Sequence, residues 1–107
     1  MAHNDELLTK LHKCAAACEE CMDSCLNEDN IKMLAECIRT DRDCAKVCHM
    51  AASFVASHSK FTGSVLTLCE ELCVQCAEEC EKHEHDHCKR CASACRECAE
   101  ACRSYAA

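Results

Sequence analysis

The sequence predicts an all-α protein, an antiparallel up-down-up-down four-helix bundle with a cysteine-lined core. Within each stretch of the chain the cysteines recur at steps of three, four or seven residues, a spacing that keeps side chains on one face of an α-helix. Alternating strand patterns are absent. The 107 residues include no proline and a single glycine, so no linker divides them. We therefore assign residues 1–107 to one domain.

Three polar breaks separate the expected helices. Asp29 or Asn30 can cap a new helix after the first break, and Asp86 can do so after the third. The second break holds the only glycine, Gly63. The breaks span residues 27–30, 57–64 and 83–87. The expected helices lie near 5–26, 30–57, 64–82 and 87–105. Short connections of this kind join antiparallel neighbours.

Cysteine must form much of the interior. The chain has 16 Cys and 16 Ala, whereas Leu, Ile, Val, Met and Phe together number only 20. That is a thin conventional core for 107 residues. Reduced cysteine packs as a small hydrophobic residue. In a reducing compartment, so many thiols indicate metal binding or redox chemistry rather than disulfides.

The net charge and the first residues of the chain limit the expected partners and cellular location of the protein. The net charge of -7 argues against nucleic acid, which requires a basic surface. Residues 1–6 are polar and acidic and lack the apolar run of a signal peptide. No stretch approaches the roughly 20 apolar residues of a membrane span. We expect a soluble cytoplasmic protein that does not bind a membrane.

The sixteen cysteines are the candidate metal ligands, and we expect them to face the bundle axis. They form four groups, one on each expected helix. The groups are Cys14, Cys18, Cys21 and Cys25; Cys37, Cys44 and Cys48; Cys69, Cys73, Cys76 and Cys80; and Cys88, Cys91, Cys95, Cys98 and Cys102.

Seven Cys-x-x-x-Cys pairs account for fourteen of these residues. Helical residues four apart have Cβ atoms about 5–6 Å apart, too far for an unstrained disulfide. A metal bound at about 2.3 Å from each sulfur tolerates that span. Soft thiolates select Cu(I), Zn(II) or iron–sulfur clusters. A continuous ladder of pairs favours multiple Cu(I) ions, because Cu(I) accepts low coordination numbers and thiolates can bridge two ions.

Two alternatives remain at this point. A metallothionein-like Zn or Cd buffer would use four thiolates for each closed site. A thiol redox protein is less favoured, because a thioredoxin-type Cys-x-x-Cys follows a strand and no strand is expected. We therefore expect a binding protein and no enzyme.

Two segments resemble the cytosolic branch of the bacterial four-helix-bundle copper storage proteins, the Csp family. One runs from Cys80 through the His83-Glu84-His85-Asp86-His87 sequence to Ser104, and the other spans residues 38–48. The resemblance covers nearly the whole chain. It implies many Cu(I) ions bound by inward-facing cysteines, storage in the cytosol and, commonly, a homotetramer.

Antiparallel threading assigns the remaining side chains to two ends. One end should be closed by a hydrophobic plug that includes all three aromatic residues. Its members are Leu7, Leu8, Leu11, Phe54, Val55, Phe61, Val65, Leu66 and Tyr105. The opposite end, termed the mouth, should admit copper. Its members are Met22, Cys25, Met33, Cys37, Cys80, His83, His85, His87 and Cys88.

At the mouth, Cys37 and Cys88 fall outside the i,i+4 pairs. We expect them to form mixed, weaker sites with Met33, His85 or His87, because thioether and imidazole are neutral donors. Asp41 stands where the pattern expects a cysteine. A carboxylate is a poor Cu(I) ligand, so we expect Asp41 to pair with Arg39, Arg42 or another cation, or to face away from the axis. Acceptance of thiol protons by Asp41 is the weaker hypothesis.

Overall fold

A computed structural model describes the backbone of residues 2–106 and the side chains of residues 4–105. Four α-helices and one 3₁₀ turn make up the fold, and this part of the chain contains no strand. The elements are α1 (Ala2–Leu26), η1 (Ile31–Leu34), α2 (Ala35–Ala56), α3 (Thr62–Cys80) and α4 (Asp86–Ala106). The all-α four-helix prediction is confirmed.

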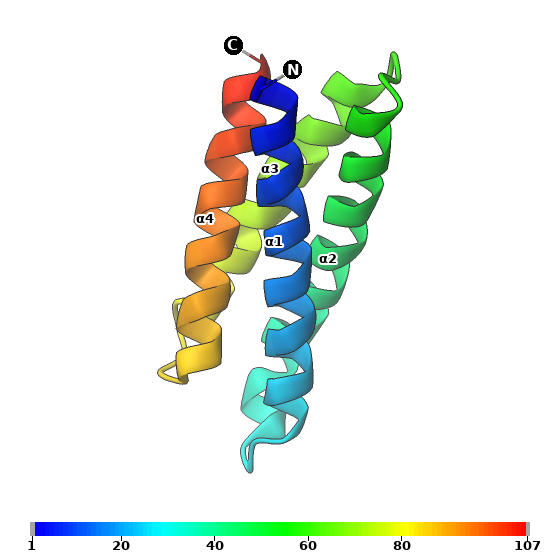
Figure 1. The fold of residues 1–107 in the computed structure, drawn as a ribbon. Helices are drawn as coiled ribbons and strands as arrows, with labels where there is room; N and C mark the ends of the chain where they lie inside the picture. Colours follow the sequence, from blue (N-terminus) through cyan, green and yellow to red (C-terminus); the bar gives the residue numbers. More distant parts are fainter. Residues whose placement is uncertain (1, 107) are drawn as a thin grey trace.

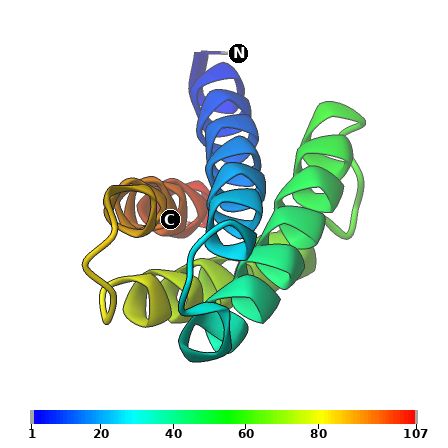
Figure 2. The same cartoon turned by 90° about the horizontal axis from the view of Figure 1, so that it is seen from below.

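The helices run up and down around a common axis. Successive helices are antiparallel, so the start of α1 and the end of α4 lie together at one end (Figure 1). Seen along the axis, each helix lies beside two neighbours, and α4 closes the ring against α1 (Figure 2). The bundle measures 44 × 17 × 17 Å. No helix within the described residues is long and apolar enough to cross a lipid bilayer.

All four helices begin one to five residues from their expected starts. The second helix was expected from residue 30, but residues 31–34 form the 3₁₀ turn η1 and the α-helix begins at Ala35. Asn30 precedes η1 without a capping hydrogen bond from its side chain. Asp86 is the first residue of α4 rather than the residue before it. The negative charge of its carboxylate is still favourable there, because the start of a helix carries partial positive charge.

Small side chains fill the centre of the bundle. All sixteen cysteines are at most 2% exposed, so the predicted inward orientation is confirmed. Small alanines let the helices approach closely along the same length. The buried alanines are Ala15, Ala45, Ala51, Ala52, Ala77, Ala92, Ala94 and Ala99.

The closed end is sealed by aliphatic rather than aromatic residues. Leu7, Leu11, Val55 and Leu66 are buried there, as expected. The prediction of an aromatic plug is wrong, because Phe61 is 56% exposed and the other aromatics are not buried either. The reason is position: Phe61 precedes α3 in the connection from α2, outside the ring of helices.

The α2–α3 connection turns at His58 rather than at the glycine. His58 has φ 54°, the left-handed conformation, whereas Gly63 lies inside α3 with no positive φ. His58 N–H donates to the Val55 carbonyl, and Ser59 N–H donates to the Phe54 carbonyl. These two bonds form a Schellman motif, which usually places glycine at the left-handed position.

We expect His58→Gly to raise the free energy of unfolding by about 1 kcal/mol, because glycine adopts this backbone conformation without steric strain. Chemical denaturation of the reduced protein measures the change. Ser57→Gly is the matched control: Ser57 has φ −89°, so glycine there relieves nothing. Equal effects of the two substitutions would contradict the role assigned to His58.

Candidate metal centre

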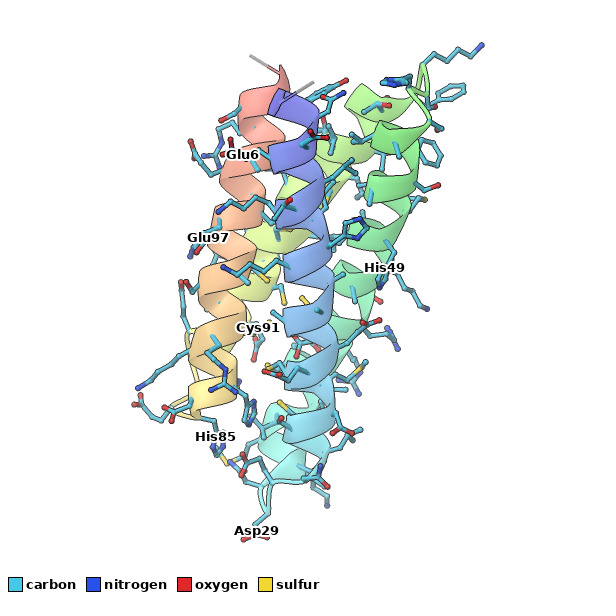
Figure 3. All side chains as sticks on the ribbon, in the orientation of Figure 1. Glu6, Asp29, His49, His85, Cys91 and Glu97 are labelled. Carbon is cyan, nitrogen blue, oxygen red and sulfur yellow. The ribbon has the colours of Figure 1, made fainter. Side chains whose placement is uncertain are left out.

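The cysteines of four helices form one continuous thiol core. All sixteen are free thiols. Between helices, Sγ–Sγ distances run from 3.5 Å for Cys37–Cys80, through 3.7 Å for Cys14–Cys95, to 4.0 Å for Cys14–Cys44. Figure 3 shows Cys91 directed into this interior, while His49 lies on the outer surface.

The contacts within a helix are no closer than those between helices. The i,i+4 pairs Cys44–Cys48 and Cys69–Cys73 have Sγ–Sγ distances of 4.0 Å. With metal–sulfur bonds of about 2.3 Å, a planar three-coordinate site separates its sulfurs by about 4 Å. The predicted pairs within each helix and the contacts between helices therefore both have separations that suit such sites.

The potential ligand atoms gather in groups of four within 4.8 Å of one another. Five such groups are Cys14/Cys44/Cys48/Cys73, Cys14/Cys18/Cys44/Cys95, Cys18/Cys76/Cys91/Cys95, Cys48/Cys69/Cys73/Cys98 and Cys21/Cys25/His87/Cys88. Six cysteines belong to two of these groups. They are Cys14, Cys18, Cys44, Cys48, Cys73 and Cys95. Shared sulfurs of this kind suit ligands that bridge neighbouring ions.

At the mouth, His87 joins the thiols. Its Nδ1 lies 3.5 Å from Cys21 Sγ and 3.6 Å from Cys88 Sγ. Its Nε2 lies 2.8 Å from Glu28 Oε2. Burial lowers the pKa of His87, but hydrogen bonds with Cys21 and Glu28 raise it by more, so the net shift is upward. The geometry expected for a mixed site of Cys88 with a histidine is present.

The other predicted mouth ligands lie farther out. His85 Nδ1 is 3.3 Å from Glu28 Oε2, and the His85 ring stacks on His87 with 5.2 Å between centroids. His83 instead pairs with Glu79, and both side chains are largely buried, 14% and 12% exposed. Figure 3 places His85 at the lower end of the bundle. Met33 is 72% exposed on η1, so a Cys37–Met33 site would need that turn to move.

Asp41 lies inside the thiol core, in the half nearer the mouth. It is fully buried, and its Oδ1 accepts hydrogen bonds from Cys76 and Cys91, each at 3.2 Å. Cys80 donates to the same oxygen at 3.7 Å, and Cys37 donates to Oδ2 at 3.8 Å. Burial, followed by the nearby Cys91 and Cys76, raises the pKa of Asp41 well above its usual value.

The expectation that Asp41 pairs with an arginine or faces outward is therefore wrong. Arg39 pairs with Glu36 and Arg42 with Asp43, both on the surface of α2. Asp41 continues the cysteine register of its helix, four residues after Cys37 and three before Cys44, and this register carries it inward. That spacing was the signal for its position. Glu28 gave no such signal, because it lies in a connection where no helical period predicts its direction.

Burial also acts on the thiols of the mouth. It raises the pKa of Cys25 and of Cys88, which favours the protonated forms. The pKa of Cys21 moves the other way, because its interactions with Cys37 and Cys80 favour the thiolate.

We expect Asp41→Asn to flatten the pH dependence of stability of the reduced, metal-free protein. A carboxyl group that is protonated in the folded protein and ionised in the unfolded chain releases its proton on unfolding. The free energy of unfolding therefore falls as the pH rises above about 4. The wild-type free energy of unfolding should fall more steeply than that of the variant, by about 1.4 kcal/mol per pH unit.

Urea unfolding between about pH 4 and pH 7 measures both slopes. Asp43→Asn is the control, because Asp43 lies two residues away on α2 and pairs with Arg42 at the surface. Parallel profiles for the wild type and Asp41→Asn would show that Asp41 is ionised in the folded protein.

Comparison with known proteins is consistent with this geometry. The cysteine-rich protein YhjQ of Bacillus subtilis is 46% identical over 79 residues, which cover 74% of this chain and 73% of that protein. The structure of apo-Csp3, a copper storage protein from Bacillus subtilis, matches with a TM-score of 0.91 and 42% identity, covering 96% of this chain and 98% of the other.

A second solved structure is a cytosolic copper storage protein from Streptomyces lividans carrying five coppers. It matches with a TM-score of 0.93 and 38% identity, and the match covers 96% of this chain and 91% of the other. The sequence profile of the copper storage proteins matches residues 1–107. The cysteine-lined four-helix bundle described above therefore belongs to the copper storage protein family, Csp.

Proposed function

We propose that this protein stores Cu(I) in the cytosol by binding many ions to the thiolates of its bundle core. The observation that carries the proposal is the sharing of buried thiols between neighbouring groups of four. The related structures include a Cu(I)-bound copper storage protein, BsCsp3, with a TM-score of 0.94 and 41% identity. We assign all sixteen cysteines as ligands, with His87 as a ligand at the mouth.

Shared thiolates favour Cu(I) over Zn(II). A closed Zn(II) site takes four ligands to itself, so two overlapping groups cannot both be filled without sharing sulfurs. Cu(I) accepts two or three soft ligands, and its thiolates bridge. A core of bridging thiolates therefore holds about one Cu(I) for each cysteine. It also separates the ions from water and from oxidants.

We expect the reduced protein to bind about sixteen Cu(I) ions when each thiolate bridges two ions. Anaerobic titration with Cu(I) against a chromogenic chelator measures the stoichiometry. The melting temperature should rise with loading, because the ions bind the folded state. Saturation near four Zn(II), with weak competition by Cu(I), would instead favour the Zn or Cd buffer. Thiol–disulfide turnover without metal would favour a redox enzyme, whereas we propose a protein without catalytic activity.

Copper access is proposed to occur at the mouth, in steps. His87 shields Cys21 and Cys88 from solvent, with 10% of its own side chain exposed. A neutral imidazole holds Cu(I) less tightly than a second thiolate, so an ion bound there can pass inward. Exposed Met33 and partly exposed His85 are proposed to assist at the rim.

We expect His87→Ala to change the rate of Cu(I) release to a chelator while total capacity falls by at most about one ion. His85→Ala and Met33→Leu should change the rate less, because neither side chain reaches the thiols. Stopped-flow transfer to the chelator gives the rates, and the titration above gives the capacity. A loss of many equivalents with unchanged kinetics would contradict the mouth assignment.

The assembly is also a proposal. The family resemblance favours a homotetramer, and light scattering of the purified protein measures its mass. Ala15, Ala92 and Ala99 are buried within a single bundle. A subunit interface must therefore use other residues.

A further inference from the structure

Glu28 links the two connections that meet at the mouth. It lies between α1 and η1, whereas His85 and His87 lie at the start of α4. Its Oε2 is 2.8 Å from His87 Nε2 and 3.3 Å from His85 Nδ1. One carboxylate oxygen therefore contacts both rings of the stacked pair.

The two nitrogens of His87 face different partners. Nε2 faces the carboxylate of Glu28, which can only accept a hydrogen bond. The proton of the neutral ring therefore resides on Nε2, and Nδ1 keeps its lone pair. Nδ1 is the atom that lies 3.5 Å from Cys21 Sγ and 3.6 Å from Cys88 Sγ. A ring with this tautomer presents a donor atom, not a proton, to the metal side.

We propose that Glu28 is a positioning residue for copper loading, which holds His87 in the tautomer and orientation that present Nδ1 to a Cu(I) ion between Cys21 and Cys88. The inference rests on the proposed function. Carboxylates that hold a metal-binding histidine in this way also raise its basicity, and their loss typically lowers metal affinity or activity 10- to 100-fold.

A histidine–carboxylate contact alone is not sufficient evidence, because the surface carries others. His49 Nε2 is 3.1 Å from Glu19 Oε2, with both side chains more than half exposed. His49 lies on the outer surface between α1 and α2, away from the thiols (Figure 3). The Glu28–His87 pair differs in two respects: its histidine side chain is only 10% exposed, and the second ring nitrogen faces two cysteines.

The test compares Glu28→Ala with Glu19→Ala in the intact, reduced protein. Nitrogen-15 NMR of the histidine rings, at a pH where they are neutral, reports which nitrogen carries the proton. We expect Glu28→Ala to shift His87 toward the Nδ1–H tautomer and to slow the first phase of Cu(I) uptake about tenfold. Glu28→Gln keeps one acceptor oxygen without the charge and should give an intermediate rate. Glu19→Ala should alter the signals of His49 and leave uptake unchanged.

Copper binding by the wild type separates this inference from the proposed function. If the wild type stores Cu(I) and Glu28→Ala keeps both the wild-type tautomer and the wild-type uptake rate, Glu28 has no positioning role. Slower uptake with an unchanged His87 tautomer also overturns the proposal, because Glu28 would then act through its charge alone. A wild type that binds no Cu(I) would refute the proposed function itself.

Discussion

The burial of sixteen thiols along one axis is the constraint on which the rest of this structure depends. A protonated thiol is a tolerable core group, whereas an unpaired thiolate in the same place is not, because burying a charge without compensation is unfavourable. Ionisation of the core is therefore coupled to metal binding: each proton leaves as a cation arrives. The same coupling links the folded state to its cargo, since a ligand that binds only this state stabilises it.

The thiol core determines how the bundle is built around it. Cysteine and alanine are small, so the helices must lie close together to leave no voids, and the molecule is 17 Å across but 44 Å long. Large aliphatic residues are concentrated at the closed end, where Leu7, Leu11, Val55 and Leu66 exclude water. At the mouth one large aliphatic side chain, Leu34 of η1, is buried, and His87 with its carboxylate partner adds a polar cover.

Two carboxylates near the thiols have opposite surroundings. Asp41 is fully buried and accepts hydrogen bonds from four cysteines, an environment that favours its protonated form. Glu28 is about a third exposed and contacts two imidazole rings, an environment that is compatible with a charged carboxylate. One carboxyl therefore belongs to the thiol network itself, and the other acts on that network through His87.

The sequence by itself determined the helices, their antiparallel order and the inward face of the cysteines, because a spacing of three, four or seven residues encodes the direction of side chains within one helix. The same register contained Asp41, although a preference based on charge alone placed it wrongly at the surface. Only the tertiary structure decided which thiols from different helices share a site, since rotation and height between helices depend on packing at every contact. It also decided that Phe61 lies outside the ring of helices. The contact between Glu28 and His87 across the mouth was likewise decided by the tertiary structure, because Glu28 lies in a connection that has no helical periodicity.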